Sequence, residues 1–428
     1  MNIYPFVSRL KSASFLRLTL INMGLLDELL TGFPTVGLPL VHEQLGLSYE
    51  QIGLLFSIGA IVSAVIEPPM FLLADRGSKR PWVIGGFVVL VLAFLLAGSV
   101  PTFFVLALSF ALFYPAVGAA VSLSQAVLID LAPQQSARTM TRWTLLSGIG
   151  DLLSPLAVTT ILSLGLGWRG LSWTAAAIWL VAALIVAMQR FPKPLTSYSH
   201  KYGEADISKA QLVEEPVEQP EEPTEEADEV TLSESTEERV GLLQNLRQGL
   251  RDTVLLRWAA LSIFTAMLDE VFLAFAVLYL RDVLHADELA IGLIIAAQML
   301  AGLLSLFVLE RLLGRVAPVR LLTLAASLAL LGMIGLLAIH ALWCAALSLI
   351  VISFGASCLY PIVESEAYNR QPGRSGMVQA IIQLGAPFEI VLPGIVGLLA
   401  ARFGLLASLG FLGSAPLLFL LLAPRKSA

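Results

Sequence analysis

Two pairs of adjacent acids stand inside strongly apolar stretches of this sequence. Asp27 and Glu28 lie in the stretch MGLLDELLTGFP, and Asp269 and Glu270 lie in AMLDEVFLAFA. A carboxylate at the middle of a membrane span costs at least ~2.5 kcal/mol on insertion scales, so we expect it to face water or a partner. Acids in such places are candidates for binding a proton or a cation.

Helical spacing separates the two members of each acid pair. In the first segment, Thr31 and Thr35 fall on the same helix face as Asp27. In the second segment, Thr265 falls on the same face as Asp269. We therefore expect the aspartate of each pair to line an internal cavity, and the glutamate to brace the helices around it.

Further polar side chains recur on matching faces of later apolar segments. The acids expected to act as proton-coupling or cavity groups are Asp27, Asp151, Asp269, Glu364 and Glu389. The side chains expected to bind a solute are Thr31, Tyr114, Ser122, Gln125, Thr265, Ser357, Tyr360, Gln379 and Gln383. Polar contacts between helices in membranes are worth about 0.6 kcal/mol on average, which does not offset the insertion cost of several carboxylates. For Glu364, a gate contact with Arg370 or Arg374 is the alternative role.

Composition places the chain in a membrane. Of its 428 residues, 57% are hydrophobic and 14% are charged, which is far from the balance of a soluble domain. No charged residue occurs from Trp82 to Ile129, a run long enough for two spans of about 20 residues. We therefore expect an all-α membrane protein. Hydrophobic runs and their breakers predict twelve spans, near 16–40, 51–73, 82–99, 103–130, 141–164, 171–190, 256–280, 289–310, 321–339, 344–368, 376–401 and 405–423.

Basic residues set the expected orientation. If the N-terminus lies inside, only Arg169, Arg281 and Arg402 of the 26 Lys and Arg fall outside, so the positive-inside rule favours two cytoplasmic termini. No small-residue cleavage site follows the first apolar run, so we expect that span to be retained. The protein is expected to be a multi-pass protein of the inner or plasma membrane. Cys344 and Cys358 fall too far apart on one predicted helix to form a disulfide.

The middle of the chain has a different composition. Residues 214–238 are rich in Asp and Glu and contain no Lys, Arg or aromatic residue, so we expect them to be disordered. Leucines that recur every four residues after this stretch predict an amphipathic helix on the membrane surface. The expected organisation is a six-helix bundle over 1–195, a disordered acidic cytoplasmic linker over 196–239, an interfacial helix over 240–255 and a second six-helix bundle over 256–428.

Short motifs of the first half recur in the second half at nearly the same separation. The matched sets are Tyr114-Pro115 with Tyr360-Pro361, Asp151 with Glu389, and Ile52-Gly53-Leu54 with Ile291-Gly292-Leu293. Gly118 and Glu364 are separated by the same number of residues as Tyr114 and Tyr360, so the repeat makes them equivalent. The first half therefore has glycine at the position where the second half has glutamate. Duplicated bundles of pseudo-symmetric halves commonly hold their substrate near the midplane between the halves.

The loop after the second span resembles the signature of the major facilitator superfamily, G-x-x-x-D-R-x-G-R-K/R. The chain reads LLADRGSKRP at 72–81, and the matching residues are Asp75, Arg76, Lys79 and Arg80. Phe71 and Ser78 stand where the family has glycine. A looser copy, LERLLGRV at 309–316, follows the eighth span. The resemblance extends over essentially the whole chain, including the long central loop.

The resemblance implies two pseudo-symmetric six-helix bundles that rock around a central cavity, driven by a proton gradient or by the gradient of the substrate. It implies a gating role for Asp75, Arg76 and Arg80, and in the second copy for Glu310 and Arg311. The implied partners are a small-molecule substrate, protons and the lipid bilayer. We expect a monomer that does not bind nucleic acid.

Lys and Arg are missing from the middle of every predicted span. Carriers of organic anions usually need a basic ligand, so a neutral or cationic organic solute is favoured. The expected function is secondary active transport by alternating access, with efflux in exchange for protons first and proton-coupled uptake of a sugar or other nutrient as the alternative. The glycine-rich motif of the family's drug exporters is absent from the fifth span, which reads SGIGDLLSPLAV. A membrane sensor that transports nothing is a remote alternative.

The sequence offers no catalytic constellation. Its four histidines fall in or next to predicted loops and form no HExxH pattern, and no phosphate-binding loop is present. We therefore expect neither an enzyme, a cofactor nor a metal site, and no direct drive by ATP.

The acidic linker yields a first prediction. Deletion of residues 214–238 should leave the transport rate within about twofold, because a shorter flexible tether still spans the gap between the bundles. The rate is measured by solute flux in proteoliposomes at matched protein content. Complete loss of flux in a correctly inserted deletion variant would instead show that the linker takes part in assembly or regulation.

Overall fold

Almost all of the described part of the chain is helical. The computed structural model describes residues 13–99, 102–191, 246–268 and 270–424, and for a few helical positions, chiefly 31–45, it describes the backbone alone. The expected linker and Asp269 lie outside the described residues. Of the expected interfacial helix, residues 246–251 are helical, and Gly249 lies against Ile381 of the second bundle.

The first half of the chain supplies six helical spans. Its elements are α2 (Ala13–Leu45), α3 (Tyr49–Ala74), α4 (Arg80–Ser99), α5 (Phe103–Val117), the π-turn η1 (Gly118–Ser122), α6 (Leu123–Leu131), the 3-10 turn η2 (Pro133–Gln135), α7 (Ser136–Ser163) and α8 (Gly167–Ala187). A capping box starts α3, because the Ser48 side chain accepts from Gln51 N while Ser48 N donates to the Gln51 side chain.

The second half supplies the other spans, and several of these consist of two shorter helices. Its elements are α12 (Thr253–Thr265), the 3-10 turn η3 (Ala266–Leu268), α13 (Glu270–Asp282), α14 (Glu288–Leu312), α15 (Pro318–Ala338), α16 (Leu342–Ala356), α17 (Leu359–Arg370), α18 (Ser375–Gln383), α19 (Ala386–Phe403), α20 (Leu405–Leu412) and α21 (Ser414–Leu422).

Proline and glycine account for several of the breaks inside spans. Pro115 precedes the π-turn that begins at Gly118, and Pro361 lies in the first turn of α17. Gly385 and Pro387 mark the start of α19. Proline has no N–H to give to the helical ladder, so it is tolerated in a first turn and interrupts the ladder elsewhere. The breaks leave backbone groups available in the middle of the bundle.

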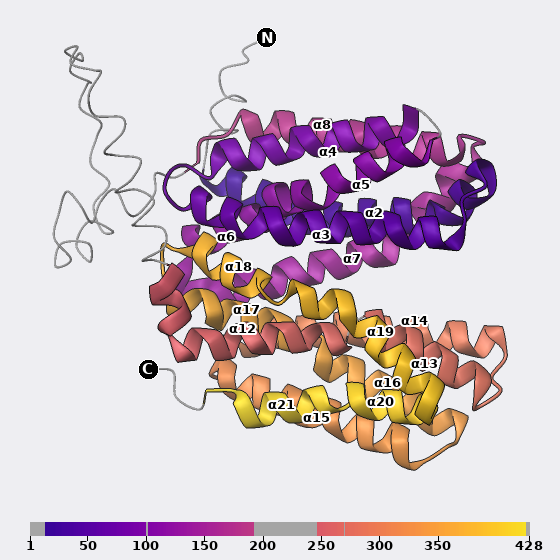
Figure 1. Cartoon of the computed structure of the whole chain (residues 1–428). Coiled ribbons are helices and arrows are strands. Elements are labelled where there is room, and N and C mark those ends of the chain that lie inside the picture. Colours follow the sequence, from indigo (N-terminus) through magenta and orange to yellow (C-terminus); the bar gives the residue numbers. More distant parts are fainter. Residues whose placement is uncertain (1–12, 100–101, 192–245, 269, 425–428) are drawn as a thin grey trace, which may run out of the picture.

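The helices form two bundles, one from each half of the chain (Figure 1). Inside the first bundle α2 packs on α7 and α4 packs on α8, and inside the second bundle α15 packs on α16. Between the bundles, α3 packs against α18, and α7 packs against α14 and α17. Each bundle has its own large hydrophobic core. Met140 and Leu145 of α7 belong to the core of the second bundle, so the two cores meet there.

Eleven of the described helical segments are long and apolar enough to cross a membrane. The helix α2, which carries Arg17, Asp27 and Glu28, supplies the remaining expected span. Large apolar side chains such as Phe104 and Leu289 are exposed on the outside of the bundles, as a hydrocarbon environment allows. The predicted all-α membrane protein with two six-span halves is confirmed.

Two neighbouring glycines of α4 test how closely the first bundle is packed. A Cβ added at Gly86 would lie 2.5 Å from Ala120 N in η1, whereas a Cβ at Gly85 would meet no atom within 4 Å. The variant Gly86→Ala should therefore lose about 1–3 kcal/mol of stability through overpacking, and Gly85→Ala should match the parent protein. Thermal unfolding in detergent measures the difference. Equal effects of the two substitutions would contradict the described approach of α4 to η1.

Candidate functional site

The two bundles are joined by a cluster of charges at one end of the molecule. We name this the basic end; it is the end where α3 leads into α4 and α17 leads into α18. Lys79 Nζ lies 2.9 Å from Asp75 Oδ1 and 2.7 Å from Asp130 Oδ2. It also donates to Ser375 Oγ of the second bundle at 2.7 Å, and Ser375 Oγ donates to Asp130 Oδ2 at 2.8 Å.

The protonation of Lys79 follows from these contacts. Burial alone would lower the pKa of Lys79, but the charges of Asp75 and Asp130 outweigh it, so the pKa lies above its usual value. The ammonium group therefore stays charged while this end is closed. Loss of either carboxylate would leave a buried cation with fewer partners, which is costly.

Asp75 also binds the first turn of α18. Its Oδ1 accepts from Gly376 N at 2.8 Å, and its Oδ2 accepts from Met377 N at 2.6 Å. The first N–H groups of a helix have no partner within the helix, and the helix dipole favours an anion there. We call Asp75, Lys79 and Asp130 together with residues 375–377 the basic-end latch.

Two further polar contacts join the bundles near the latch. Ser136 Oγ lies 2.7 Å from Asn369 Oδ1, and Arg142 Nε donates to Glu310 Oε1 at 2.7 Å. Figure 1 shows the same end, where α18 reaches α3 and α6. The closed basic end therefore depends on polar contacts between helices that belong to different halves.

The structure separates the residues for which a gating role was predicted. Asp75 and Glu310 make contacts between the bundles. Arg80 donates to Ala187 O within the first bundle, and Arg76 and Arg311 are exposed. Sequence reasoning did not assign Lys79, Asp130 or Ser375 to the gate. Asp130 had a signal, since it is the acid that ends the charge-free run of the third and fourth spans.

Near the middle of the second bundle, the carboxyl group of Glu364 is buried. Glu364 of α17 is 2% exposed, and its Oε1 accepts from Ser262 Oγ of α12 at 2.6 Å. Its Oε2 is buried with no hydrogen-bond partner among the described residues. The alternative gate contacts are not formed, because Arg370 pairs with Asp252 at 2.9 Å and Arg374 bonds to Gln248 at 3.2 Å. Glu364 therefore has a vacant acceptor in the interior.

Asp252 caps the first turn of α12 at the basic end. Burial alone would raise the pKa of this carboxyl, but hydrogen bonds from Leu255 N, Arg370 and Val254 N outweigh it, so the pKa lies below its usual value. Arg370 is therefore held by a group that remains anionic, and it stays away from Glu364.

Tyr360 lies one helical turn before Glu364 and faces the other bundle. Its Oη accepts from Gln125 Nε2 of α6 at 3.4 Å. The charges of Glu28, Glu364 and Glu389 all act on its phenol group, so acids of α2, α17 and α19 approach the same point. This convergence brings predicted cavity residues from both halves together and defines the candidate central site.

The other predicted site residues are placed less uniformly. Asp151 and Glu389 are exposed on α7 and α19, Asp27 is half-buried on α2, and Ser122 and Gln383 are half-buried. Some of the polar side chains are engaged by neighbours: Tyr368 donates to Gln379, Thr265 donates to Ser262 O, Tyr114 lies against Gly59, and Ser357 lies against Gly302. Asp269 and the side chain of Thr31 lie outside the described residues.

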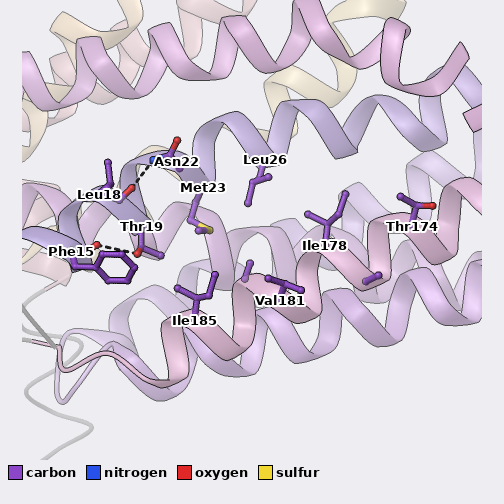
Figure 2. Close-up of a pocket in the computed structure, with 12 residues that line it drawn as sticks. Phe15, Leu18, Thr19, Asn22, Met23, Leu26, Thr174, Ile178, Val181 and Ile185 are labelled. Carbon is purple, nitrogen blue, oxygen red and sulfur yellow. Dashed lines mark hydrogen bonds between the residues drawn. The ribbon is translucent and has the colours of Figure 1, made fainter. Parts of the chain in front are cut away.

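An apolar groove of about 560 Å³ lies apart from this site, between α2 and α8 (Figure 2). Leu18, Met23 and Val181 are among its lining residues. Two of its polar side chains bond to carbonyl oxygens of their own helix, since Thr19 donates to Phe15 O and Asn22 donates to Leu18 O. The groove therefore offers hydrocarbon contact and lacks the acids that mark the central site.

Comparison with protein families decides the class of the molecule. Residues 21–386 match the family model of the Major Facilitator Superfamily. The chain belongs to the major facilitator superfamily. The resemblance seen in the sequence is thereby confirmed, and the protein is a multi-pass membrane transporter and not an enzyme. Among curated proteins, none matches the chain in sequence.

Solved structures of this superfamily share the fold. A structure of the E. coli fucose:proton symporter FucP matches with a TM-score of 0.70 and 14% identity over 96% of this chain and 98% of its own. The human organic anion transporter MFSD10 matches with a TM-score of 0.67 and 16% identity over 97% of this chain and 100% of its own. The proton:xylose symporter XylE, bound to 6-bromo-6-deoxy-D-glucose, matches with a TM-score of 0.68 and 15% identity over 96% of this chain and 95% of its own. Identities this low show the fold of the superfamily and no more.

The basic-end latch yields a prediction about the closed state. The variant Asp75→Asn should open this end, because it weakens charge-assisted hydrogen bonds worth about 1.5–3 kcal/mol, equivalent to about ten- to hundredfold in the closed-to-open ratio. Spin labels at Gln134 and Arg320, which are exposed at this end in different bundles, report the opening as longer distances. The native Cys344 and Cys358 are buried and free.

Asp282→Asn is the matched control, because Asp282 pairs with its neighbour Arg281 at the opposite end of the second bundle. It should leave the label distances unchanged. If Asp75→Asn and Asp282→Asn give the same distance distributions, the latch does not hold the basic end closed.

Proposed function

We propose that this chain is a proton-coupled secondary transporter of a small organic solute that is neutral or cationic. The observation that carries the proposal is the buried carboxyl of Glu364, which has one serine partner and a vacant oxygen. A proton is the partner that this oxygen lacks, and a protonated carboxyl can also donate a hydrogen bond to a solute hydroxyl. Such a group can link proton binding to solute binding.

The basic-end latch supplies the gating half of the proposal. We orient the basic end toward the cytoplasm from the distribution of Lys and Arg, with both termini on that side of the inner or plasma membrane. The described state is then closed toward the cytoplasm. Polar contacts between bundles can release and reform, whereas each hydrophobic core stays intact. Alternating access by a monomer follows from rocking of one bundle against the other.

Uptake together with a proton is the first direction we propose. A neutral hydroxylated solute fits Glu364, Ser262, Gln125 and Tyr360, which offer hydrogen-bonding groups from both bundles. Two proteins of the same fold are described as sugar–proton symporters, FucP and XylE, and this supports the proposal at the level of the fold. Symport requires that proton and solute bind together, so solute affinity should rise as pH falls.

Export in exchange for protons is the second candidate. Asp151 and Glu389 are exposed, and Lys and Arg of the described spans lie near helix ends. These acids suit a cationic solute that competes with protons for carboxylates. Competition predicts that solute affinity falls as pH falls, which is opposite in sign to symport. A panel of neutral polyols, sugars and organic cations in proteoliposomes, with a pH gradient imposed in either direction, separates the two candidates.

The role of Glu364 is tested by Glu364→Gln. Solute affinity in detergent should lose its dependence on pH, and accumulation should no longer follow the pH gradient, because glutamine can donate a hydrogen bond but cannot bind or release the proton. Glu366→Gln is the matched control, since Glu366 lies on the same helix and is half-buried. An unchanged dependence of affinity on pH and of accumulation on the pH gradient in Glu364→Gln would exclude this carboxyl as the coupling group.

A further inference from the structure

A second carboxyl is buried in the first bundle, and neither the sequence reasoning nor the proposed function uses it. Glu67 of α3 is 6% exposed. Its Oε1 accepts from Ser63 Oγ at 2.5 Å, one turn earlier on the same helix. A glutamate and a serine thus meet in the interior here, as Glu364 and Ser262 do in the other bundle.

The space for Glu67 is provided by Gly118, the first residue of the π-turn. A Cβ added at Gly118 would lie 2.5 Å from Glu67 Oε1 and 2.6 Å from Glu67 Cδ. Any side chain at position 118 would therefore occupy the place of this carboxyl. Gly118 is the position that the internal repeat relates to Glu364. The fourth span of the first bundle thus has no acid at this position, and the second span supplies one at the same place.

The backbone beside Glu67 is also polar. Pro68 and Pro69 follow it inside α3 and have no N–H to donate to the carbonyl oxygens of Ala64 and Val65. A carboxyl, a hydroxyl and two released carbonyls in one helical turn form an environment that can keep a proton or water in the interior. The same features would be expensive in a helix that served only for packing.

Few titratable groups approach Glu67 from the elements packed on α3. Glu389 of α19 acts on it through its charge, and Arg402 lies at the far end of that helix. On α5 the one titratable group is Tyr114, whose ring lies against Gly59. The sequences of η1 and α18 contain no acid or base. No cation of these described elements stands beside Glu67, and its acidic neighbour is the exposed Glu389.

From this geometry we infer that Glu67 is a second proton-binding carboxyl, which supplies to the first bundle the acid that Glu364 supplies to the second. The inference rests on the proposed proton coupling and extends it to one protonatable site in each half. Protons would then bind on both sides of the interface across which the bundles rock. Glu389, which acts on both carboxyls through its charge, links the two sites electrostatically.

The experiment follows protonation directly and requires no known solute. The purified full-length protein is titrated from acid to neutral pH while the infrared band of protonated carboxyl groups is recorded. Glu67→Gln should remove one titrating component and Glu364→Gln a different one, and the double variant should lack both. If the difference spectrum between the parent protein and Glu67→Gln contains no titrating component, the inference is overturned.

A substitution on the neighbouring span tests the same carboxyl without removing it. Gly118→Ala places a methyl group against the carboxyl and should shift the midpoint of the component assigned to Glu67. Gly292→Ala, where an added Cβ meets no atom within 4 Å, should not shift it. If Glu67→Gln does not fold, this pair decides the question through the titrating components that remain in Glu364→Gln. If none of these components shifts when Gly118→Ala is added, or if the same one shifts with Gly292→Ala, the inference is overturned.

Measurements of proton and solute flux distinguish a failure of this inference from a failure of the proposed function. Once a solute is found, the proton flux per solute in Glu67→Gln should fall by about half, because one of two interacting sites is lost. A parent protein that moves solute without protons would refute the proposed coupling and leave the infrared assignment standing. A normal proton flux per solute in Glu67→Gln would refute the second coupling site and leave Glu364 as the coupling group.

Discussion

The cost of a carboxylate inside a membrane organises this molecule. Each acid that entered hydrocarbon would cost about 2.5–3.5 kcal/mol on insertion scales, and more without water or a partner. Glu67 and Glu364 instead turn inward, and each receives a hydrogen bond from a serine hydroxyl. Their helices present apolar side chains outward and to the cores. Buried polar contacts occur where the two bundles face each other, and a few lie inside a bundle, such as the bond from Gln189 to Thr19.

The helix breaks and the division into bundles serve the same requirement. A continuous α-helix offers no free backbone groups in the middle of a membrane, whereas each break exposes some. The breaks near Gly118, Ser357 and Gly385 lie on spans that carry the predicted cavity residues. Inside each bundle the contacts are apolar and extensive, and between the bundles many are polar and directional. Polar contacts of this kind can be exchanged for water, which is what the proposed rocking of one bundle against the other requires.

Much of the architecture could be predicted from the sequence, because hydrophobic runs and breakers are local signals. The spans were accessible in this way, the duplicated halves were accessible from recurring short motifs, and the role of Asp75 between the bundles was accessible from its place in the family signature. The partners of Asp75 on α18 were not accessible, because Gly376 and Met377 lie 301 and 302 residues away and bind through their backbone N–H groups. Residue spacing is a weaker guide where a span is broken. After the end of α16 at Ala356 the surroundings change, because Ser353 and Ser357 lie against Gly302 whereas Glu364 bonds to Ser262.

The position of Gly118, which is equivalent to that of Glu364, shows a second limit of prediction from the sequence. Glu67 had no equivalent on the eighth span, so in the sequence it stood outside the repeat. Its carboxyl nevertheless fills the space beside Gly118, and the equivalence of the halves holds for the position of a functional group although not for the residue that bears it. Alignment of the two halves pairs residues by their position along the chain. It therefore does not detect two equivalent acids that lie on different spans.

The acceptor side of the latch, Asp75, is a side chain, but the donor side consists of the N–H groups of Gly376 and Met377. A main-chain donor is present in every amino acid except proline. Any residue other than proline at position 377 therefore keeps the N–H group that Asp75 binds. Position 376 is different, because a Cβ added there would lie 2.7 Å from Asp75 Oδ1, so selection for the contact falls on Gly376 as well as on Asp75.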